Sequence, residues 1–449
     1  MSQFRVVHLG AVFVCCVLLC TLALAADQKS PTKLSDLPPE AEQAISAALA
    51  RELPGVPHFT LTASDGANGD SFGVSAAIDG NTVVVGAAVS GNQEKGAVYV
   101  FVKPANGWRN LTQTAKLTSS DEQPLDQFGR NVAVSGNTVV VGASEATING
   151  NQDQGAAYIF VKPAGGWTNM TQTAKLTADD GVSYSLFGAA TAISGDTVVV
   201  GSPLSLANNP APGVAYVFVQ PQNGWKDMTQ TAELTASDST EYDEFGASVS
   251  ISGNTLIVGA PEDGCSCNAG PGAAYVFLEP PSGWANATET AKLTASDGIV
   301  NELFGWSVSL NNKTAVVGAL GTAYVFVEPF GGWDNMTQTA ELTNAEGGDG
   351  FGIPVSISGN VILVGDPGIQ GLTGRAFAFL KPASGWKNTS QYNLQLGISF
   401  PNKDDMFGSS LAISGTTGVV GAPYAPTSQP CKGGQCAPGP GEAFVFTAK

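Results

Sequence analysis

Histidine is almost absent from this chain: only His8 and His58 occur in 449 residues. His8 lies in a stretch that we expect to be removed, as argued below, which leaves His58 alone. A catalytic triad built on histidine needs the imidazole as its base, and zinc enzymes commonly hold their metal through several imidazoles. The sequence therefore argues against both classes of enzyme.

Long apolar runs are also scarce. The one that exists extends from Leu9 to Leu24, follows Arg5, and ends in Ala23-Leu24-Ala25. This pattern is typical of a secretory signal peptide, so we expect residues 1–25 to be cleaved after Ala25. The alternatives are a membrane anchor, for which the run is short, and a lipoprotein signal at Cys20, for which Leu19 stands where a small residue is wanted. We expect an exported, secreted protein with no membrane span.

Few cysteines remain once the leader is gone. Cys15, Cys16 and Cys20 leave with it, and four cysteines remain in two local pairs. In an oxidising compartment Cys431 and Cys436 are expected to form a disulfide. The second pair, Cys265 and Cys267, is the other candidate, although its ring would be tight. A zinc site is the alternative, but no histidine lies near either pair.

Basic residues are outnumbered: 20 Lys and Arg stand against 38 Asp and Glu, for a formal net charge of −18. Such a surface repels a phosphate backbone, so nucleic acid is not an expected partner. Residues 26–57 form a separate segment, in which Pro38-Pro39 precedes Ile45, Leu49 and Leu53 at helical spacing until Pro54. We expect a linker with a short amphipathic helix, which is either a tether or a docking element.

The rest of the chain is a repeat marked by Phe-Gly. Successive spacings of its seven copies are 56, 59, 58, 59, 47 and 56 residues, and the copies begin at Phe72, Phe128, Phe187, Phe245, Phe304, Phe351 and Phe407. In the fourth copy the alternation over 245–251 predicts a strand, called A, and Ser252-Gly253-Asn254 predicts a tight turn. Strands B (255–258), C (273–278) and D (289–294) follow. Each unit therefore reads as a four-stranded antiparallel meander.

The ends of the repeat predict a closed ring. The last copy has strands A, B and C but ends at Lys449 without D, whereas Phe59-Thr-Leu-Thr62 matches strand D and has no A, B or C before it. Gly-Trp accordingly occurs six times, at Trp108, Trp167, Trp225, Trp284, Trp333 and Trp386. We expect an all-β, seven-bladed β-propeller over residues 58–449, in which the N-terminal strand completes the last blade.

These motifs resemble the FG-GAP repeat family, the propeller repeats of integrin α chains and of many secreted microbial proteins. The resemblance covers about residues 59–449 and implies the fold and a role in binding or cell adhesion. Integrin-type repeats carry a calcium loop between strands A and B. Here that connection is a minimal turn, as in Asp79-Gly-Asn81, so the family's calcium site is expected to be absent.

Strand parity places the D–A and B–C connections at one end of the ring, and the D–A connections hold 17 of the 38 acids. Variable loops on a rigid scaffold are common binding sites, although acids also solvate Gly-rich turns. The candidate ligand-binding residues are Asp65, Asp70, Asp126, Asp180, Asp238, Asp243, Asp297, Asp349 and Asp404. Weaker candidates for calcium are two sets: Asp65, Asn68 and Asp70, and Asp238, Glu241 and Asp243.

The sequence predicts a monomeric, non-catalytic module for an extracellular protein or glycan, without a cofactor. A carbohydrate-active or other polymer-cleaving enzyme that uses loop carboxylates is the alternative. The repeated Phe and Trp residues are expected to be core rather than a sugar platform. Sequons at Asn110, Asn169, Asn286, Asn312, Asn335 and Asn388 are either glycosylation sites or by-products of the repeat.

Overall fold

The protein is known from a computed structural model, which describes residues 58–90, 95–203, 205–206, 209–262, 270–345, 350–367, 374–397, 405–425 and 439–447. The expected signal peptide, the expected helix within 26–57, both cysteine pairs, Asp349 and Asp404 lie outside these residues. The described residues form strands and turns only. They include no helix with the length and apolar character needed to cross a membrane.

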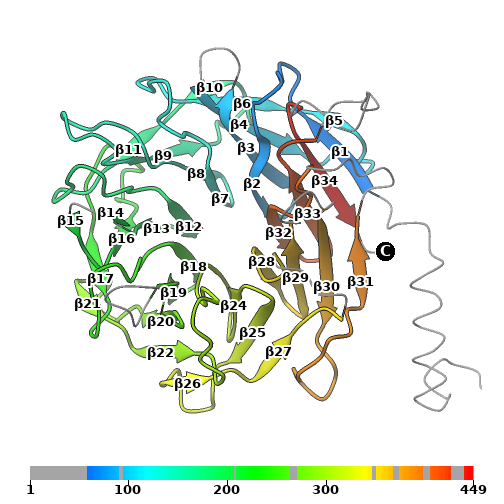
Figure 1. Ribbon diagram of the computed structural model, residues 1–449. Helices are drawn as coiled ribbons and strands as arrows, with labels where there is room; N and C mark the ends of the chain where they lie inside the picture. Colours follow the sequence, from blue (N-terminus) through cyan, green and yellow to red (C-terminus); the bar gives the residue numbers. More distant parts are fainter. Residues whose placement is uncertain are drawn as a thin grey trace, which may run out of the picture. The chain divides into compact units, whose positions relative to one another are not determined.

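Seven sheets stand around a ring, one for each Phe-Gly copy, and we number them as blades 1 to 7 in the order of those copies (Figure 1). In each sheet strand A is the edge strand nearest the centre of the ring, and strand B is paired with it. The A strands are β2 (Phe72–Asp79), β7 (Asn131–Ser135), β12 (Ala190–Ser194), β18 (Ser248–Ser252), β23 (Ser307–Asn311), β28 (Val355–Ser358) and β32 (Ser410–Ser414). The B strands are β3 (Thr82–Ser90), β8 (Thr138–Ala143), β13 (Thr197–Ser202), β19 (Thr255–Ala260), β24 (Thr314–Ala319), β29 (Val361–Asp366) and β33 (Thr417–Ala422).

The outer half of each blade contains strands C and D. The C strands are β4 (Lys95–Val102), β9 (Ala156–Val161), β16 (Val214–Val219), β20 (Ala273–Leu278), β25 (Thr322–Val327), β30 (Arg375–Leu380) and β34 (Glu442–Thr447). The D strands are β6 (Ala115–Thr118), β11 (Ala174–Leu176), β17 (Ala232–Thr235), β22 (Ala291–Thr294), β27 (Ala340–Leu342), β31 (Leu394–Leu396) and β1 (His58–Thr62). A small hairpin, β14 (Ser205–Leu206) and β15 (Asn209–Pro210), projects from the B–C connection of blade 3.

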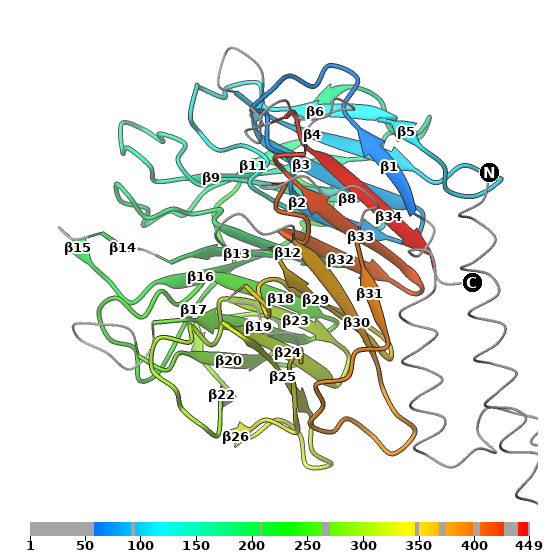
Figure 2. The same cartoon turned by 45° about the vertical axis from the view of Figure 1, so that its right-hand side comes forward.

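The N-terminal strand closes the ring, as predicted. β1 runs antiparallel to β34, with Phe59 opposite Val445 and Leu61 opposite Ala443. The sheet order is therefore β32-β33-β34-β1, so both ends of the described chain share blade 7. Figures 1 and 2 show β1 beside β34.

The A–B turns link neighbouring blades at the centre. Each turn has two residues, which confirms the predicted minimal connection. The side chain of the last residue of each A strand accepts a hydrogen bond from a main-chain amide in the A–B turn of the next blade. For example, Ser135 Oγ accepts from the Gly195 amide at 3.2 Å. Seven such bonds complete the circuit: Gly80 to Ser414, Gly136 to Asp79, Gly195 to Ser135, Gly253 to Ser194, Asn312 to Ser252, Gly359 to Asn311 and Gly415 to Ser358.

A glycine contact between blades explains why the repeat needs glycine in both Phe-Gly and strand B. A Cβ added to Gly86 in strand B of blade 1 would overlap the carbonyl oxygen of Gly129 in the Phe-Gly of blade 2. Gly129 itself has φ +92, a conformation that side chains disfavour. Since the same contact recurs from Gly421 to Gly73, it also spans the closing interface.

The apolar core lies between the blades. Seven clusters of buried residues each combine side chains of two neighbouring blades. Phe128, for example, packs edge-on to Tyr158 and near Phe160 of its own blade, beside Val98 of blade 1. All six Gly-Trp tryptophans are buried, at 5–8% exposure. The prediction that these aromatic residues are core is confirmed.

The C–D connection hooks each blade to the one before it. β5 (Leu111–Thr112), β10 (Met170–Thr171), β21 (Ala287–Thr288) and β26 (Met336–Thr337) each pair in parallel with the preceding D strand. The sequon residue Asn169 accepts a hydrogen bond from the Lys116 amide through Oδ1, at 2.8 Å. In blade 3 Asp227 makes the same contact with the Lys175 amide, so the position requires an acceptor oxygen and not an amide group. Asparagine at this position therefore has a structural role that does not depend on glycosylation.

Hydrogen bonds confirm the predicted strand parity. The Glu145 amide in a B–C connection donates to the Asp126 carbonyl in a D–A connection, so these loops share one end of the ring. At the other end the Lys162 amide, which follows strand C, donates to the Asn137 carbonyl of the A–B turn. We call the first end the D–A face and the second the hairpin face.

Candidate ligand-binding face

The D–A loops that enter blades 1 to 5 each have polar residues at the same two distances before the Phe of Phe-Gly. An aspartate lies seven residues before the Phe of Phe-Gly, and a second polar residue lies two residues before it. The first position holds Asp65, Asp121, Asp180, Asp238 and Asp297, and the second holds Asp70, Asp126, Ser185, Asp243 and Glu302.

The second position shapes the loop. Asp70, Asp126 and Asp243 are 1–7% exposed. Each carboxylate accepts a hydrogen bond from the main-chain amide three residues earlier, for example Asp126 from Gln123 at 2.7 Å. Ser185 does the same for Val182 at 3.1 Å. The residue just before each Phe then has positive φ, as at Gln127 with φ +59. These aspartates therefore stabilise the loop from within.

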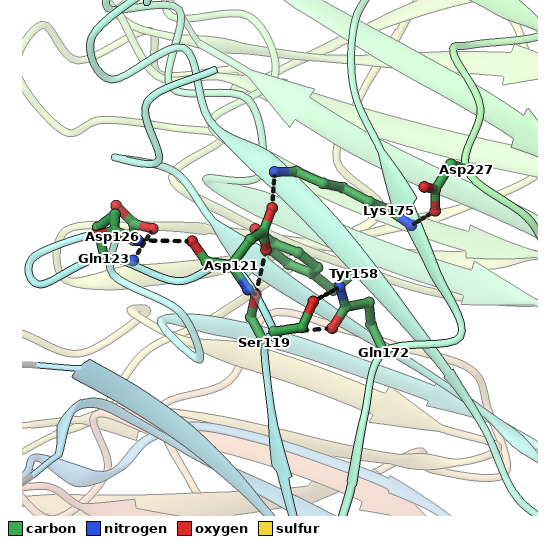
Figure 3. Close-up of polar contacts among 9 residues, drawn as sticks. Ser119, Asp121, Gln123, Asp126, Tyr158, Gln172, Lys175 and Asp227 are labelled. Atoms are coloured by element: carbon green, nitrogen blue, oxygen red, sulfur yellow. Dashed lines mark hydrogen bonds and ion pairs between the residues drawn. The ribbon is translucent and has the colours of Figure 1, made fainter. Parts of the chain in front are cut away.

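The aspartate at the first position contacts strands C and D of the blade that its loop enters. In blade 2, Asp121 receives the Lys175 ammonium of β11 at 2.6 Å and the Tyr158 hydroxyl of β9 at 3.0 Å (Figure 3). The Lys175 ammonium also lies 5.3 Å from the centre of the Tyr158 ring, which is a cation–π distance. Lys116 lies in the same way between Asp65 and Tyr99 in blade 1, and Lys292 between Asp238 and Tyr275 in blade 4.

The pKa values of these aspartates reflect the pairing. Partial burial raises the pKa of the Asp65 carboxyl, but the hydrogen bond and charge of Lys116 outweigh it, so the pKa lies below its usual value. The same balance, with Lys292 as the cation, lowers the pKa of Asp238. Three of the first-position aspartates, Asp65, Asp121 and Asp238, are thus neutralised by a lysine of the chain itself.

Blades 3 and 5 keep the aspartate and the tyrosine but replace the lysine. On β17 Glu233 lies opposite Tyr216, the ladder position that Lys175 occupies opposite Tyr158. On β27 Glu341 lies opposite Tyr324. The Tyr216 hydroxyl still donates to Asp180 at 2.9 Å, and the Tyr324 hydroxyl donates to Asp297 at 3.0 Å.

These replacements gather carboxylates. Asp179, Asp180 and Glu233 have ligand oxygens within 4.8 Å of one another, a grouping that no other His, Cys, Asp or Glu residues reach within the described ranges. Gln230 holds this cluster, since its Nε2 donates to Asp179 at 2.6 Å and to Glu233 at 2.9 Å. In blade 5, burial raises the pKa of Glu302 and the charge of Asp297 raises it further.

Blades 6 and 7 lack the arrangement. Their ladder pairs are Phe377 opposite Gln395 and Phe444 opposite Thr60. The tyrosine and the basic or acidic partner are thus absent together, which indicates that they act as one unit.

The structure places the predicted site residues as follows. Asp65 and Asp238 pair with lysines, Asp180 and Asp297 accept from tyrosines, and Asp70, Asp126 and Asp243 are buried in loops. Asn68 and Glu241, from the two weak calcium sets, are exposed. Residues missed by the sequence reasoning are Gln230, Glu233, Glu341, Tyr216 and Tyr324, whereas Asp179 is one of the 17 acids predicted for the D–A connections. The sequence signal that could have found this arrangement is the replacement of the repeated Ala-Lys-Leu of strand D by Ala-Glu-Leu at 232–234 and 340–342.

The D–A face also exposes apolar side chains. Eleven large hydrophobic residues are exposed among the described residues, of which seven lie in D–A loops and one, Tyr424, in a B–C loop. The seven are Leu125, Val182, Tyr184, Tyr242, Ile299, Val300 and Trp306. Exposed aromatic residues are enriched at protein–protein interfaces.

A buried glutamate, Glu122, and a partly buried one, Glu442, lie near this face. Burial raises the pKa of Glu122 to about 7, against the hydrogen bond that it accepts from the Gly96 amide. Burial, with the nearby charge of Asp405, also raises the pKa of Glu442 to about 7.

A family model described as FG-GAP repeat matches residues 59–101, 111–160, 170–218, 228–277, 287–326 and 401–446. The first five matched segments begin in a D strand or just before one, the sixth begins after β31, and all six end within the C strand of the next blade. The match omits blade 6, whose strands the structure nevertheless forms. No curated protein matches the chain.

Proposed function

Because the chain belongs to the FG-GAP repeat family, whose β-propeller suits a binding or adhesion module, we propose that it is a secreted binding protein. Its D–A face binds an extracellular protein or glycan, and it does not catalyse a reaction. The observation that carries this proposal is the gathering of exposed Tyr184, Tyr242 and Trp306 with carboxylates on one face of a closed scaffold. Aromatic residues commonly dominate the binding energy of interfaces.

Export through the expected signal peptide and a Cys431–Cys436 disulfide belong to this proposal. Intact mass spectrometry of the secreted, non-reduced protein is expected to lack residues 1–25 and to show the disulfide. Two free thiols at Cys431 and Cys436 would contradict it. We also propose that calcium binds weakly, so titration calorimetry is expected to find no submicromolar site.

The test of the proposed function is a binding screen of the secreted protein against extracellular-matrix proteins and glycans. We expect a ligand whose affinity falls at least about tenfold in the variant Tyr242→Ala/Trp306→Ala, because truncating an anchoring aromatic residue typically costs more than 1 kcal/mol. Phe330→Ala is the matched control, since Phe330 is also exposed but belongs to the C–D connection of the hairpin face. Equal loss in both variants, or release of a cleaved product, would refute the proposal.

A further inference from the structure

In blades 1, 2 and 4 an aspartate and a tyrosine form a binding site (the receptor) for an ammonium group, and a lysine of the same chain occupies this site. Its parts are the ring of a tyrosine on strand C, the carboxylate of the first-position aspartate, and the lysine directly opposite the tyrosine on strand D. The ammonium lies 2.6 Å from the carboxylate oxygen and 5.1–5.4 Å from the ring centre in all three blades. The geometry therefore repeats closely from blade to blade.

Blades 3 and 5 retain the receptor and reverse the charge of its occupant. The tyrosine hydroxyl still holds the aspartate, at 2.9 Å in blade 3 and 3.0 Å in blade 5. Glutamate takes the ladder position of the lysine. A neutral residue there would simply remove the ion pair, as Gln395 does in blade 6, where the tyrosine is also replaced. A glutamate at this position instead adds negative charge beside the aspartate, which favours binding of a cation from outside the chain.

We propose that blades 3 and 5 each bind a lysine or arginine side chain of a basic polypeptide partner. The residues are Tyr216, Asp179, Asp180 and Glu233 in blade 3, and Tyr324, Asp297, Glu302 and Glu341 in blade 5. This inference rests on the proposed function, because it names the chemistry of the partner that the D–A face binds.

A second feature coincides with these two sites. Five of the seven exposed large hydrophobic residues of the described D–A loops lie in the loops entering blades 3 and 5: Val182, Tyr184, Ile299, Val300 and Trp306. Val182 and Tyr184 follow Asp180 within four residues, and Ile299 and Val300 follow Asp297 within three. A polypeptide presents apolar groups beside its basic side chains, and this surface offers partners for both.

A side-chain cation fits these sites better than a metal ion. The aromatic ring contributes attraction to an organic cation but offers no ligand to a hard metal ion, which takes oxygen atoms. The carboxylates also already accept hydrogen bonds, Asp179 and Glu233 from Gln230 and Asp180 from Tyr216. These donors orient the oxygens for another N–H group and occupy lone pairs that a metal ion would need.

The experiment uses the secreted protein and a fluorescein-labelled octalysine peptide, with binding followed by fluorescence anisotropy. The variant Glu233→Lys/Glu341→Lys copies the sequence of blades 1, 2 and 4, so each new lysine is expected to fill its own receptor. We expect octalysine to bind at least about tenfold more weakly, with a urea midpoint no lower than that of the wild type. Glu233→Gln/Glu341→Gln, which copies blade 6, is expected to give a smaller loss.

Glu279→Lys/Asp334→Lys is the charge-matched control on the hairpin face, and we expect it to change octalysine binding less than about twofold. Equal weakening in this control, or undiminished binding in Glu233→Lys/Glu341→Lys, would overturn the proposal. It would also be overturned if calcium bound at Glu233 and Glu341 while octalysine did not. These results leave the proposed function standing, because its own test is the loss of screened-ligand binding in Tyr242→Ala/Trp306→Ala relative to Phe330→Ala, without a cleaved product.

Discussion

Leu61 of β1 lies opposite Ala443 of β34, and both side chains are fully buried in the cluster that joins blade 7 to blade 1. The first and last described strands of the chain therefore form one ladder. Ring closure depends on this pairing, because without β1 strand C of blade 7 would be a bare edge. Bare edges invite aggregation.

Deleting residues 26–64 is expected to destabilise the protein by several kcal/mol. Burial of Leu61 alone is worth roughly 1.5–3 kcal/mol, and the ladder from His58 to Leu61 is lost with it. Thermal melting compares this deletion with that of residues 26–56, which spares β1 and serves as the control. If the two deletions melt alike and remain monomeric, β1 does not close the ring.

Gly86→Ala is expected to cost about 1–3 kcal/mol, typical of overpacking. The new methyl group would overlap the Gly129 carbonyl oxygen of the next blade, and the backbone must move to admit it. Gly165→Ala is the control, because a Cβ there meets nothing within 4 Å. Urea unfolding measures both, and comparable stability of the two variants would argue against the glycine contact.

Asn169→Ala is expected to lower the free energy of unfolding by about 0.5–1.5 kcal/mol, the usual net worth of a hydrogen bond. The Lys116 amide of the preceding blade loses its acceptor in this variant. Asn169→Asp is expected to be nearly neutral, since Asp227 serves as acceptor in blade 3. Urea midpoints of the two variants, measured on unglycosylated protein, decide the matter. An aspartate variant as weak as the alanine variant would show that the amide nitrogen matters.

Glu122 is expected to make stability fall as the pH rises. Its pKa increases from 4.5 to about 7 on folding because of burial, so the folded state holds the proton more tightly than the unfolded state. The contribution is complete below pH 4.5 and is lost as the pH approaches 7, a change of about 3 kcal/mol. Glu122→Gln is expected to be more stable than the wild type at pH 8 but not at pH 4, by urea unfolding. Exposed Glu241→Gln is the control, and an identical pH profile for all three proteins would contradict the expectation.

Local patterns in the sequence were enough for most of the fold. The alternation in 245–251 predicts a strand in any context, because neighbouring side chains of a strand point to opposite faces. Ser252-Gly253-Asn254 predicts a tight turn from backbone conformation alone. The orphan Phe59–Thr62 predicts closure because each blade needs four strands. These inferences need only contacts within a repeat and the count of repeats.

Only the tertiary structure decided which acids are paired with lysine, which are buried in a loop and which are gathered together. Asp65 and Asp70 look equivalent in the sequence, yet one pairs with Lys116 at the surface and the other is 2% exposed. The difference arises because the Asp70 carboxylate accepts a hydrogen bond from the Ala67 amide of its own loop, at 2.7 Å, whereas the Asp65 carboxylate lies beside the Lys116 ammonium. The partners of Asp121 and Asp180 lie in the next blade, as with Lys175, which follows Asp121 by 54 residues. Such pairs depend on how one blade registers against its neighbour, and no local pattern encodes that contact.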